Sequence, residues 1–175
     1  MVGAGPVRQP RRTTEEAPVT DKDVAIAELQ QAHDRFRDQV ADLPDSAYSE
    51  SFLGTWNLSQ VLTHMAGWYG EITPGFSRVA RGERPTPEGV DYSDADAWNA
   101  RFCANPVAGK AALASFDAAY AGYLAAARAL DASFYGVDAE RGRPKIGNRL
   151  LQGAGVHHFE EHGPEVEAWL RGRRA

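Results

Sequence analysis

The residues best suited to chemistry in this chain are three of its five histidines. His158 and His162 are four positions apart near the C-terminus, and His64 lies far earlier in the chain. Residues four apart on an α-helix lie on the same face, so the imidazoles of the pair can converge on one cation. A third imidazole from a neighbouring helix would complete a three-histidine face with open coordination positions, which is typical of a catalytic metal site. His64, His158 and His162 are therefore the predicted ligands of a divalent metal, zinc or a nickel-like ion.

The same histidines have a plainer interpretation. A pair at this spacing also occurs on polar, solvated helix faces, and a single histidine such as His64 often lies at a core boundary, bonded to a carbonyl. His157 points about 100° away from His158, which places it beside the site or at the surface, and His33 is predicted to be solvated. The run from His158 to His162 also matches the inverted zinc-peptidase signature. Only thirteen residues follow it, too few for the further ligand that this signature needs.

Other polar residues are candidates for a role beside the histidines. Glu161 lies near the face of the histidine pair, where its carboxylate could act as a general base. Asn99 follows a large aromatic residue and is predicted to point into the site as a hydrogen-bond donor. Asn148 and Arg149, together with Lys145, lie at the start of the last predicted helix, where free backbone N–H groups and cations can hold a carboxylate or a phenolate. A solvated side chain is the alternative for Glu161.

These residues need helices to position them, and the spacing of apolar residues predicts such helices. Thr20 with Asp23, and Asn57 with Gln60, have the spacing of capping boxes that begin helices. Pro74 is expected to kink the second helix or to end it at the preceding residue. The helices are predicted near residues 20–42, 57–73, 93–104, 107–131 and 146–171.

The predicted fold class is all-α. No segment shows the strict two-residue alternation of strands, and long, polar, proline- and glycine-containing loops separate some of the helices. A four-helix bundle with long crossover loops and a short extra helix satisfies this pattern. Residues 1–19 are predicted to form a disordered leader and residues 20–175 a single domain, which is long enough to bury a core.

Composition and charge narrow the classes of partner. The chain has 43% hydrophobic residues, 25% charged residues and a formal charge of −5, which is ordinary for a soluble globular protein. A nucleic-acid binder usually carries a basic stripe, whereas the arginines here cluster at the two termini. Cys103 is the one cysteine, so no intrachain disulfide can form. No apolar run is long enough for a transmembrane helix or a secretion signal. We expect a cytoplasmic protein with a small-molecule substrate, with a homodimer as an open possibility.

Two segments resemble the DinB/YfiT superfamily of four-helix bundles. Residues 54–68 contain a capped helix start and His64, and residues 158–170 contain the histidine pair. In that superfamily, histidines at these three places bind a divalent metal. The segment 96–100 and the loop before it are similar to the branch that contains the colibactin self-resistance protein, although this chain, unlike that member, keeps all three metal histidines. The resemblance covers about residues 20–172.

The resemblance implies an enzyme that acts on a small reactive organic molecule, in self-resistance to a secondary metabolite or in its tailoring. A metal-bound water would attack the electrophile in a hydrolase-like reaction. One alternative is a mycothiol-dependent transferase or isomerase, in which the metal activates the thiol of the cofactor. Another alternative is a non-catalytic resistance protein that binds a drug or the DNA damaged by it, with the histidines as polar lining.

Overall fold

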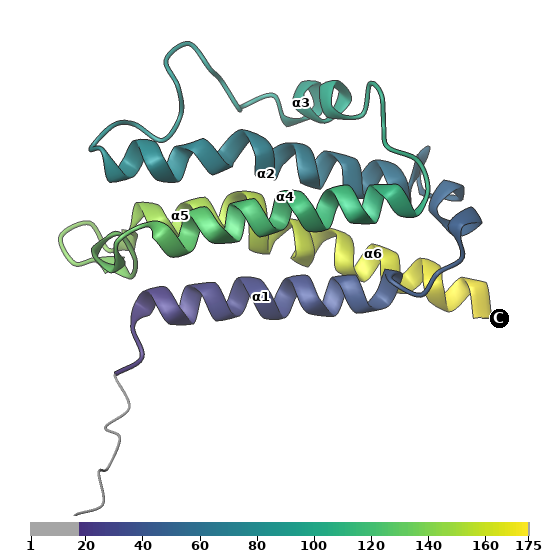
Figure 1. The fold of residues 1–175 in the computed structure, drawn as a ribbon, viewed down its shortest axis with the longest axis horizontal. Helices are drawn as coiled ribbons and strands as arrows, with labels where there is room; N and C mark the ends of the chain where they lie inside the picture. The colour runs from purple at the N-terminus through teal and green to yellow at the C-terminus, as the bar shows by residue number, and fades with distance from the viewer. Residues whose placement is uncertain (1–17, 175) are drawn as a thin grey trace, which may run out of the picture.

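Four long helical stretches run side by side along the molecule (Figure 1). The computed structural model describes residues 18–174, so the leader predicted for residues 1–19 lies almost wholly outside the described residues. A short helix, α3, lies beside α2 in the connection that joins α2 to α4. The helices are α1 (Asp21–Val40), α2 (Leu58–Ala80), α3 (Ala95–Phe102), α4 (Lys110–Ala129), α5 (Ile146–Leu151) and α6 (His157–Arg174). The predicted all-α four-helix bundle with a short extra helix is confirmed.

Two small antiparallel hairpins and two 3₁₀ helices complete the described chain. The paired strands are β1 (Ser51–Leu53) with β2 (Trp56–Asn57), and β3 (Val137–Asp138) with β4 (Arg143–Pro144). The 3₁₀ helices are η1 (Asp45–Ser49) and η2 (Ala132–Phe134). The first hairpin turns at Gly54, whose φ of 59° is a left-handed conformation that favours glycine. These strands were not expected from the sequence, because strands of two or three residues are too short to show alternation.

Reciprocal side-chain caps begin the first two long helices. The Thr20 hydroxyl accepts from the N–H of Asp23, and the Asp23 carboxylate accepts from the N–H of Thr20. Asn57 and Gln60 form the same pair of bonds at the start of α2, with both distances 3.0 Å. Both predicted capping boxes are confirmed, and a cap of this kind contributes about 1 kcal/mol. The second cap fixes where α2 begins and therefore which way His64, two turns later, points.

Of the two outcomes expected for Pro74, an end of the second helix at the preceding residue is wrong, because α2 continues to Ala80. A kink at Pro74 stays a prediction. A proline inside a helix removes one backbone hydrogen bond and crowds the carbonyl four residues earlier. That carbonyl belongs to Gly70, and both Gly70 and Pro74 are exposed, so water can replace the lost donor. Phe76 and Val79, which follow the proline, are buried. Their burial stabilises the last turns of α2 by more than the proline costs.

Aromatic side chains fill the core between the helices. α2 packs along α4, where the rings of Tyr69 and Tyr123 stack with centroids 4.8 Å apart and Phe76 meets Tyr123 edge-on. Buried tyrosine hydroxyls need acceptors. Three of them donate to backbone carbonyls: Tyr48 to Val40, Tyr123 to Leu150 and Tyr135 to Ala127. These bonds join connecting segments and neighbouring helices to the core.

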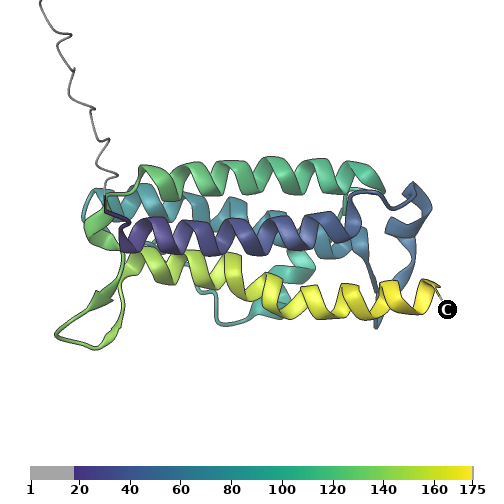
Figure 2. The ribbon, with the colours of Figure 1, turned by 90° about the horizontal axis from the view of Figure 1, so that it is seen from below.

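The expectation that His33 is solvated is wrong, since its side chain is buried with 7% of the residue exposed. Its ring lies flat on that of Tyr120 in α4, with centroids 3.6 Å apart and planes within 5°. Its Nδ1 lies 2.9 Å from the carboxylate of Asp34 and its Nε2 lies 3.8 Å from that of Asp117. α1 lies between α4 and the last helical stretch (Figure 2), so its buried face is wider than that of a helix with one neighbour.

The expectation of one uninterrupted helix over about 146–171 is also wrong. A π segment, Gln152–Val156, separates α5 from α6, and the backbone N–H of His157 donates to the carbonyl of Gln152 across it. A π turn fits one extra residue into the helix. Residues before it are therefore turned by about 100° relative to the residues after it, compared with a regular α-helix.

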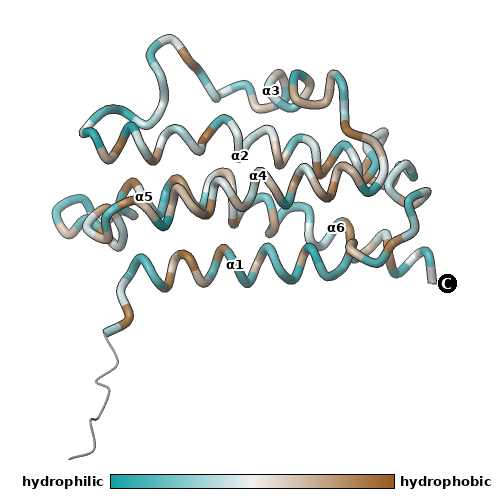
Figure 3. The backbone as a smooth tube through the Cα atoms, in the orientation of Figure 1, coloured by the Kyte–Doolittle hydropathy of each residue, from teal (hydrophilic) through white to brown (hydrophobic). Residues whose placement is uncertain are grey.

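Hydrophilic and hydrophobic positions alternate along the long helices (Figure 3), as expected for the amphipathic helices of a bundle. In α1, the apolar positions Leu29, Phe36 and Val40 are buried in the common core. Within residues 18–174, no helix is both long enough and apolar enough to cross a membrane.

We expect Gly155→Ala to destabilise the fold by about 1–3 kcal/mol, the usual cost of overpacking a core. A methyl group here would lie 2.6 Å from Cδ1 of Leu29 and 3.3 Å from the hydroxyl of Tyr123, and both side chains are fully buried. Gly153→Ala, in the same π segment, is the matched control, because nothing lies within 4 Å of its added Cβ. Urea unfolding measures both variants, and equal loss of stability in the two would contradict this packing.

Candidate functional site

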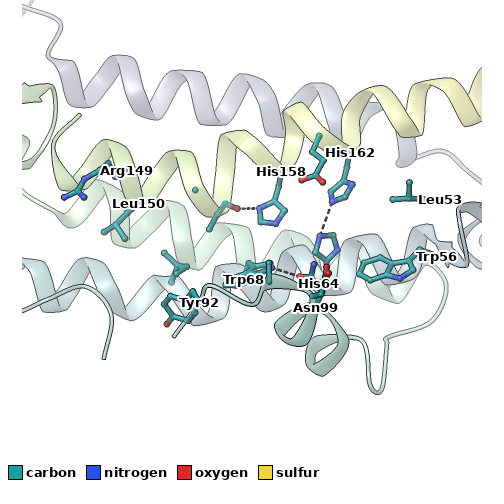
Figure 4. A pocket seen from close by; sticks show the side chains of 16 residues that line it. Leu53, Trp56, His64, Trp68, Tyr92, Asn99, Arg149, Leu150, His158 and His162 are labelled. Carbon is teal, nitrogen blue, oxygen red and sulfur yellow. Dashed lines mark hydrogen bonds between the residues drawn. The ribbon is translucent and has the colours of Figure 1, made fainter. Parts of the chain in front are cut away.

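A cavity of about 720 Å³ opens between α2, α3 and the last helical stretch, and β1 and β2 border one end. A volume of this size suits a small organic molecule. Figure 4 looks into the cavity. His64, His158 and His162 lie in its middle, Arg149 lies at one end, and Leu53 lies at the other.

The three histidines predicted as metal ligands point toward one another from two helices (Figure 4). His64 comes from α2, whereas His158 and His162 come from α6. The Nε2 atoms of His64 and His162 are 3.1 Å apart. The ring centroid of His64 lies 4.8 Å from that of His162 and 5.4 Å from that of His158, and the two α6 rings are 6.1 Å apart. The bundle therefore brings the three residues together from distant parts of the chain.

Each of these imidazoles has an oxygen acceptor beside Nδ1. The acceptors are the carbonyl of Ala154 for His158 at 2.9 Å, the carboxylate of Glu165 for His162 at 2.8 Å, and the carbonyl of Gln60 for His64 at 3.4 Å. They favour the tautomer with the proton on Nδ1, which leaves a lone pair on Nε2. At 3.1 Å, the two Nε2 atoms share a hydrogen bond if one ring carries its proton on Nε2, and two Nε2 lone pairs at this distance call for a cation beside both.

This donor set fits a divalent cation, although the rings do not stand in ligand positions. Across residues 18–174, no set of three or more His, Cys, Asp or Glu side chains is arranged closely enough to hold a metal ion. Rings that share one zinc ion through Nε2, with bonds of about 2.0–2.1 Å, have centroids about 5 Å apart. Two of the three separations are near that value, and the separation of His158 from His162, 6.1 Å, is the wide one. Convergence of all three on one ion stays a prediction.

Burial keeps the imidazoles of His64 and His158 neutral. Burial, and then the neighbouring rings of His162 and His158, lower the pKa of His64 to about 3. Burial also lowers the pKa of His158 to about 4, although its bond to the Ala154 carbonyl opposes this shift. At neutral pH both rings therefore offer lone pairs rather than protons, as metal ligands must.

Asn99 and Glu161, the predicted donor and general base, both line the cavity. The Oδ1 of Asn99 accepts a hydrogen bond from Nε1 of Trp68 at 2.8 Å. This bond fixes the orientation of the amide and leaves its nitrogen free to donate. Glu161 lies on the exposed rim, next to His162 in the chain. Their catalytic roles stay predictions.

The structure separates the two residues predicted to bind a cofactor. Arg149 lines the cavity, whereas the Oδ1 of Asn148 accepts the backbone N–H of Gly136 at 2.7 Å and so holds the segment that leads into β3. Lys145 is engaged as well, with its Nζ 3.1 Å from the carbonyl of Ser133. α5 has only six residues, too few to make its start an anion site by itself. Arg149 is the part of that prediction that reaches the cavity.

Sequence reasoning missed the aromatic wall of the cavity. Trp56, Trp68 and Tyr92 line it. Trp68 meets Tyr92 edge-on with centroids 5.8 Å apart, and the Tyr92 hydroxyl donates to the carboxylate of Glu71 at 2.9 Å. Tyr92 lies in the long connection before α3. Its place in the wall depends on how that connection folds over α2, which has no signature in the sequence.

The bundle is similar to three solved structures. The mycothiol-dependent maleylpyruvate isomerase matches with a TM-score of 0.63 and 15% identity, over 85% of this chain and 63% of that one. A protein from Streptococcus pneumoniae matches with a TM-score of 0.70 and 10% identity, over 89% of this chain and 93% of that one. An uncharacterized protein from Clostridium difficile 630 matches with a TM-score of 0.65 and 9% identity, over 89% of this chain and 98% of that one.

These likenesses establish the fold, an all-α DinB-like bundle, as the sequence predicted. The chain spans 63% of the length of the isomerase. No protein-family model matches the chain, and no curated protein matches it in sequence. The resemblance to the branch of the colibactin self-resistance protein therefore stays a prediction.

We expect the metal-free protein to lose stability as the pH falls below about 6.5, the pKa of histidine in an unfolded chain. Between that pH and the lowered pKa values of about 4 for His158 and about 3 for His64, the unfolded chain binds protons that the folded chain does not. The contribution of these two histidines to the free energy of unfolding therefore has its full value above about pH 6.5. As the pH falls below that value, the free energy of unfolding drops by up to about 1.4 kcal/mol per pH unit for each histidine.

Urea unfolding of chelator-treated protein between about pH 7 and pH 5, above the usual range of carboxylates, measures this loss. His64→Phe removes one of the titrating groups and should make the pH dependence shallower. His157→Ala is the control, because His157 is exposed. Constant stability across this pH range would contradict the neutral, buried state of the rings.

Proposed function

We propose that this protein is a metal-dependent enzyme that uses a low-molecular-weight thiol, such as mycothiol, to act on a small electrophilic organic molecule. One observation carries the proposal. Three imidazoles with Nδ1 beside oxygen acceptors surround the middle of a 720 Å³ cavity, and the Nε2 atoms of two of them are 3.1 Å apart. The fold shared with a mycothiol-dependent isomerase supports a thiol as the second reactant. A cytoplasmic location, where such thiols are found, is part of the proposal.

His64, His158 and His162 would hold the ion through Nε2. A divalent ion there supplies Lewis acidity and lowers the pKa of a neighbouring thiol. The oxygen acceptors of Gln60, Ala154 and Glu165 keep the rings in the tautomer and orientation that binding needs. Such outer partners typically change metal affinity about 10–100-fold when they are removed.

The reaction balances without an oxidant or a reductant. The thiol loses its proton, its sulfur forms a bond to an electrophilic carbon, and the displaced electron pair moves into the substrate or departs with a leaving group. Glu161, on the exposed rim, can pass the proton to solvent. The free amide nitrogen of Asn99 can donate to an oxygen on which negative charge develops.

The shape of the cavity favours two reactants over one. The histidines lie in its middle, with Trp68, Tyr92 and Arg149 toward one end and Trp56 and Leu53 toward the other (Figure 4). A thiol and an electrophile can therefore approach the same centre from opposite ends. The first expectation from the sequence was hydrolysis of a single substrate by a metal-bound water. That reaction needs only one of the two ends of the cavity.

We expect turnover of an electrophile only when a thiol is present. The probes are maleylpyruvate, the substrate in the name of the matched isomerase, and monobromobimane, a general thiol-reactive electrophile. Each is incubated with purified protein, with mycothiol and without any thiol, and the rate is compared with the reaction lacking protein. Turnover without thiol would instead indicate the hydrolase. Stoichiometric binding without product would indicate a sequestering protein.

His158→Ala should remove bound metal and lower turnover by about a hundredfold or more, since loss of a ligand exceeds the effect of losing an outer partner. The bundle should stay folded, because the variant loses only the stabilisation that metal binding adds. Elemental analysis, circular dichroism and the thiol assay measure the three effects. His157→Ala, the exposed neighbour, should behave as the wild type. A metal-free His158→Ala protein with full activity would overturn the metal-dependent proposal.

A further inference from the structure

One end of the cavity carries a positive charge that the metal site does not use. Three charged residues line the cavity within the described part of the chain: Arg149 from α5, Asp96 from α3 and Glu161 from α6. Arg149 is the one with a permanent positive charge. Of the neighbouring cations, Lys145 donates to a carbonyl, Arg141 pairs with Asp138 at 3.7 Å, and Arg143 does not line the cavity. Among residues 18–174, no side-chain hydrogen bond or ion pair engages the guanidinium of Arg149.

Apolar side chains separate Arg149 from the histidines. Leu150, Tyr92 and Trp68 lie between them in Figure 4. The polar atoms of two of these residues are turned to protein partners, since Nε1 of Trp68 donates to Asn99 and the hydroxyl of Tyr92 donates to Glu71. The surface that remains toward the cavity is apolar. The part of the cavity that leads from the histidines to Arg149 is therefore an arm with a cation at its far end and an apolar wall along its length.

The π segment gives Arg149 this position. In a regular α-helix, the nine residues from Arg149 to His158 turn through about 900°, which would place the two side chains on opposite faces. The extra residue of the π turn rotates Arg149 back by about 100°, to the side of the helix that borders the cavity. Nine residues also place Arg149 about 13 Å from His158 along the helix.

We infer that this arm binds the carboxylate end of the electrophilic substrate, and that the substrate is a long, largely apolar organic acid. The inference rests on the proposed function for the reaction, although binding itself needs no metal. Guanidinium pairs with carboxylate through two parallel hydrogen bonds. Mycothiol carries no carboxylate, so the acid group belongs to the electrophile. A short acid bound at Arg149 leaves most of this arm empty, whereas an acid with an apolar body about 13 Å long matches the rise of the helix between Arg149 and His158.

Binding of decanoate to the metal-free, full-length protein tests this inference. Isothermal titration calorimetry should detect decanoate binding to the wild type. Arg149→Gln should weaken it about tenfold, the low end for a hydrogen bond to a charged group, because Arg149 is exposed. Arg149→Lys should keep part of the affinity, because the charge remains. Butanoate should bind more weakly than decanoate, since it leaves the apolar wall uncovered.

Two controls separate the site from general attraction of anions or of apolar chains. Arg143→Gln removes an exposed arginine of β4 that does not line the cavity, and it should leave decanoate binding unchanged. Decanol, the uncharged analogue, should bind the wild type and Arg149→Gln equally. The inference is overturned if decanoate does not bind the wild type, if Arg149→Gln binds it as tightly, or if Arg143→Gln loses as much. These outcomes are independent of the metal and thiol assays, so either proposal can fail alone.

Discussion

Imidazoles that are removed from water must stay uncharged, and this constraint organises the site. A buried histidine that carried protons on both ring nitrogens would be positively charged and would need a compensating charge. The pKa of about 3 for His64 and of about 4 for His158 means that each ring carries only one proton at neutral pH. Oxygen acceptors beside Nδ1 then decide which nitrogen carries the remaining proton. The lone pairs that face the cavity follow from burial and from backbone position together.

The bundle places this centre between two unlike surroundings. On one side, the wall of Trp68 and Tyr92 leads to Arg149, and on the other side Trp56 and Leu53 form an apolar end. The polar atoms of the wall are satisfied within the protein, as the bond from Trp68 to Asn99 illustrates. A ligand in the cavity therefore meets apolar surface, with polar groups only at a few fixed points, which is how small-molecule sites gain orientation.

A shared fold does not determine the reaction. Similar bundles include a mycothiol-dependent isomerase and an uncharacterized protein. In this chain, the features that bear on chemistry are local: the acceptors beside the three rings, the π segment that turns Arg149 toward the cavity, and the connection before α3 that carries Tyr92. Each of them can differ between bundles that share the same arrangement of helices.

The sequence by itself determined the helices, both capping boxes and the identity of the three histidines, because helical periodicity and cap chemistry act within a few residues. Tertiary structure decided what depends on distant contacts. Burial of the turns after Pro74 carried α2 to Ala80, and the contact with α4 buried His33. The π segment is likewise invisible to periodicity, because one extra residue shifts the apolar pattern only slightly, yet it decides that Arg149 borders the cavity and Asn148 does not.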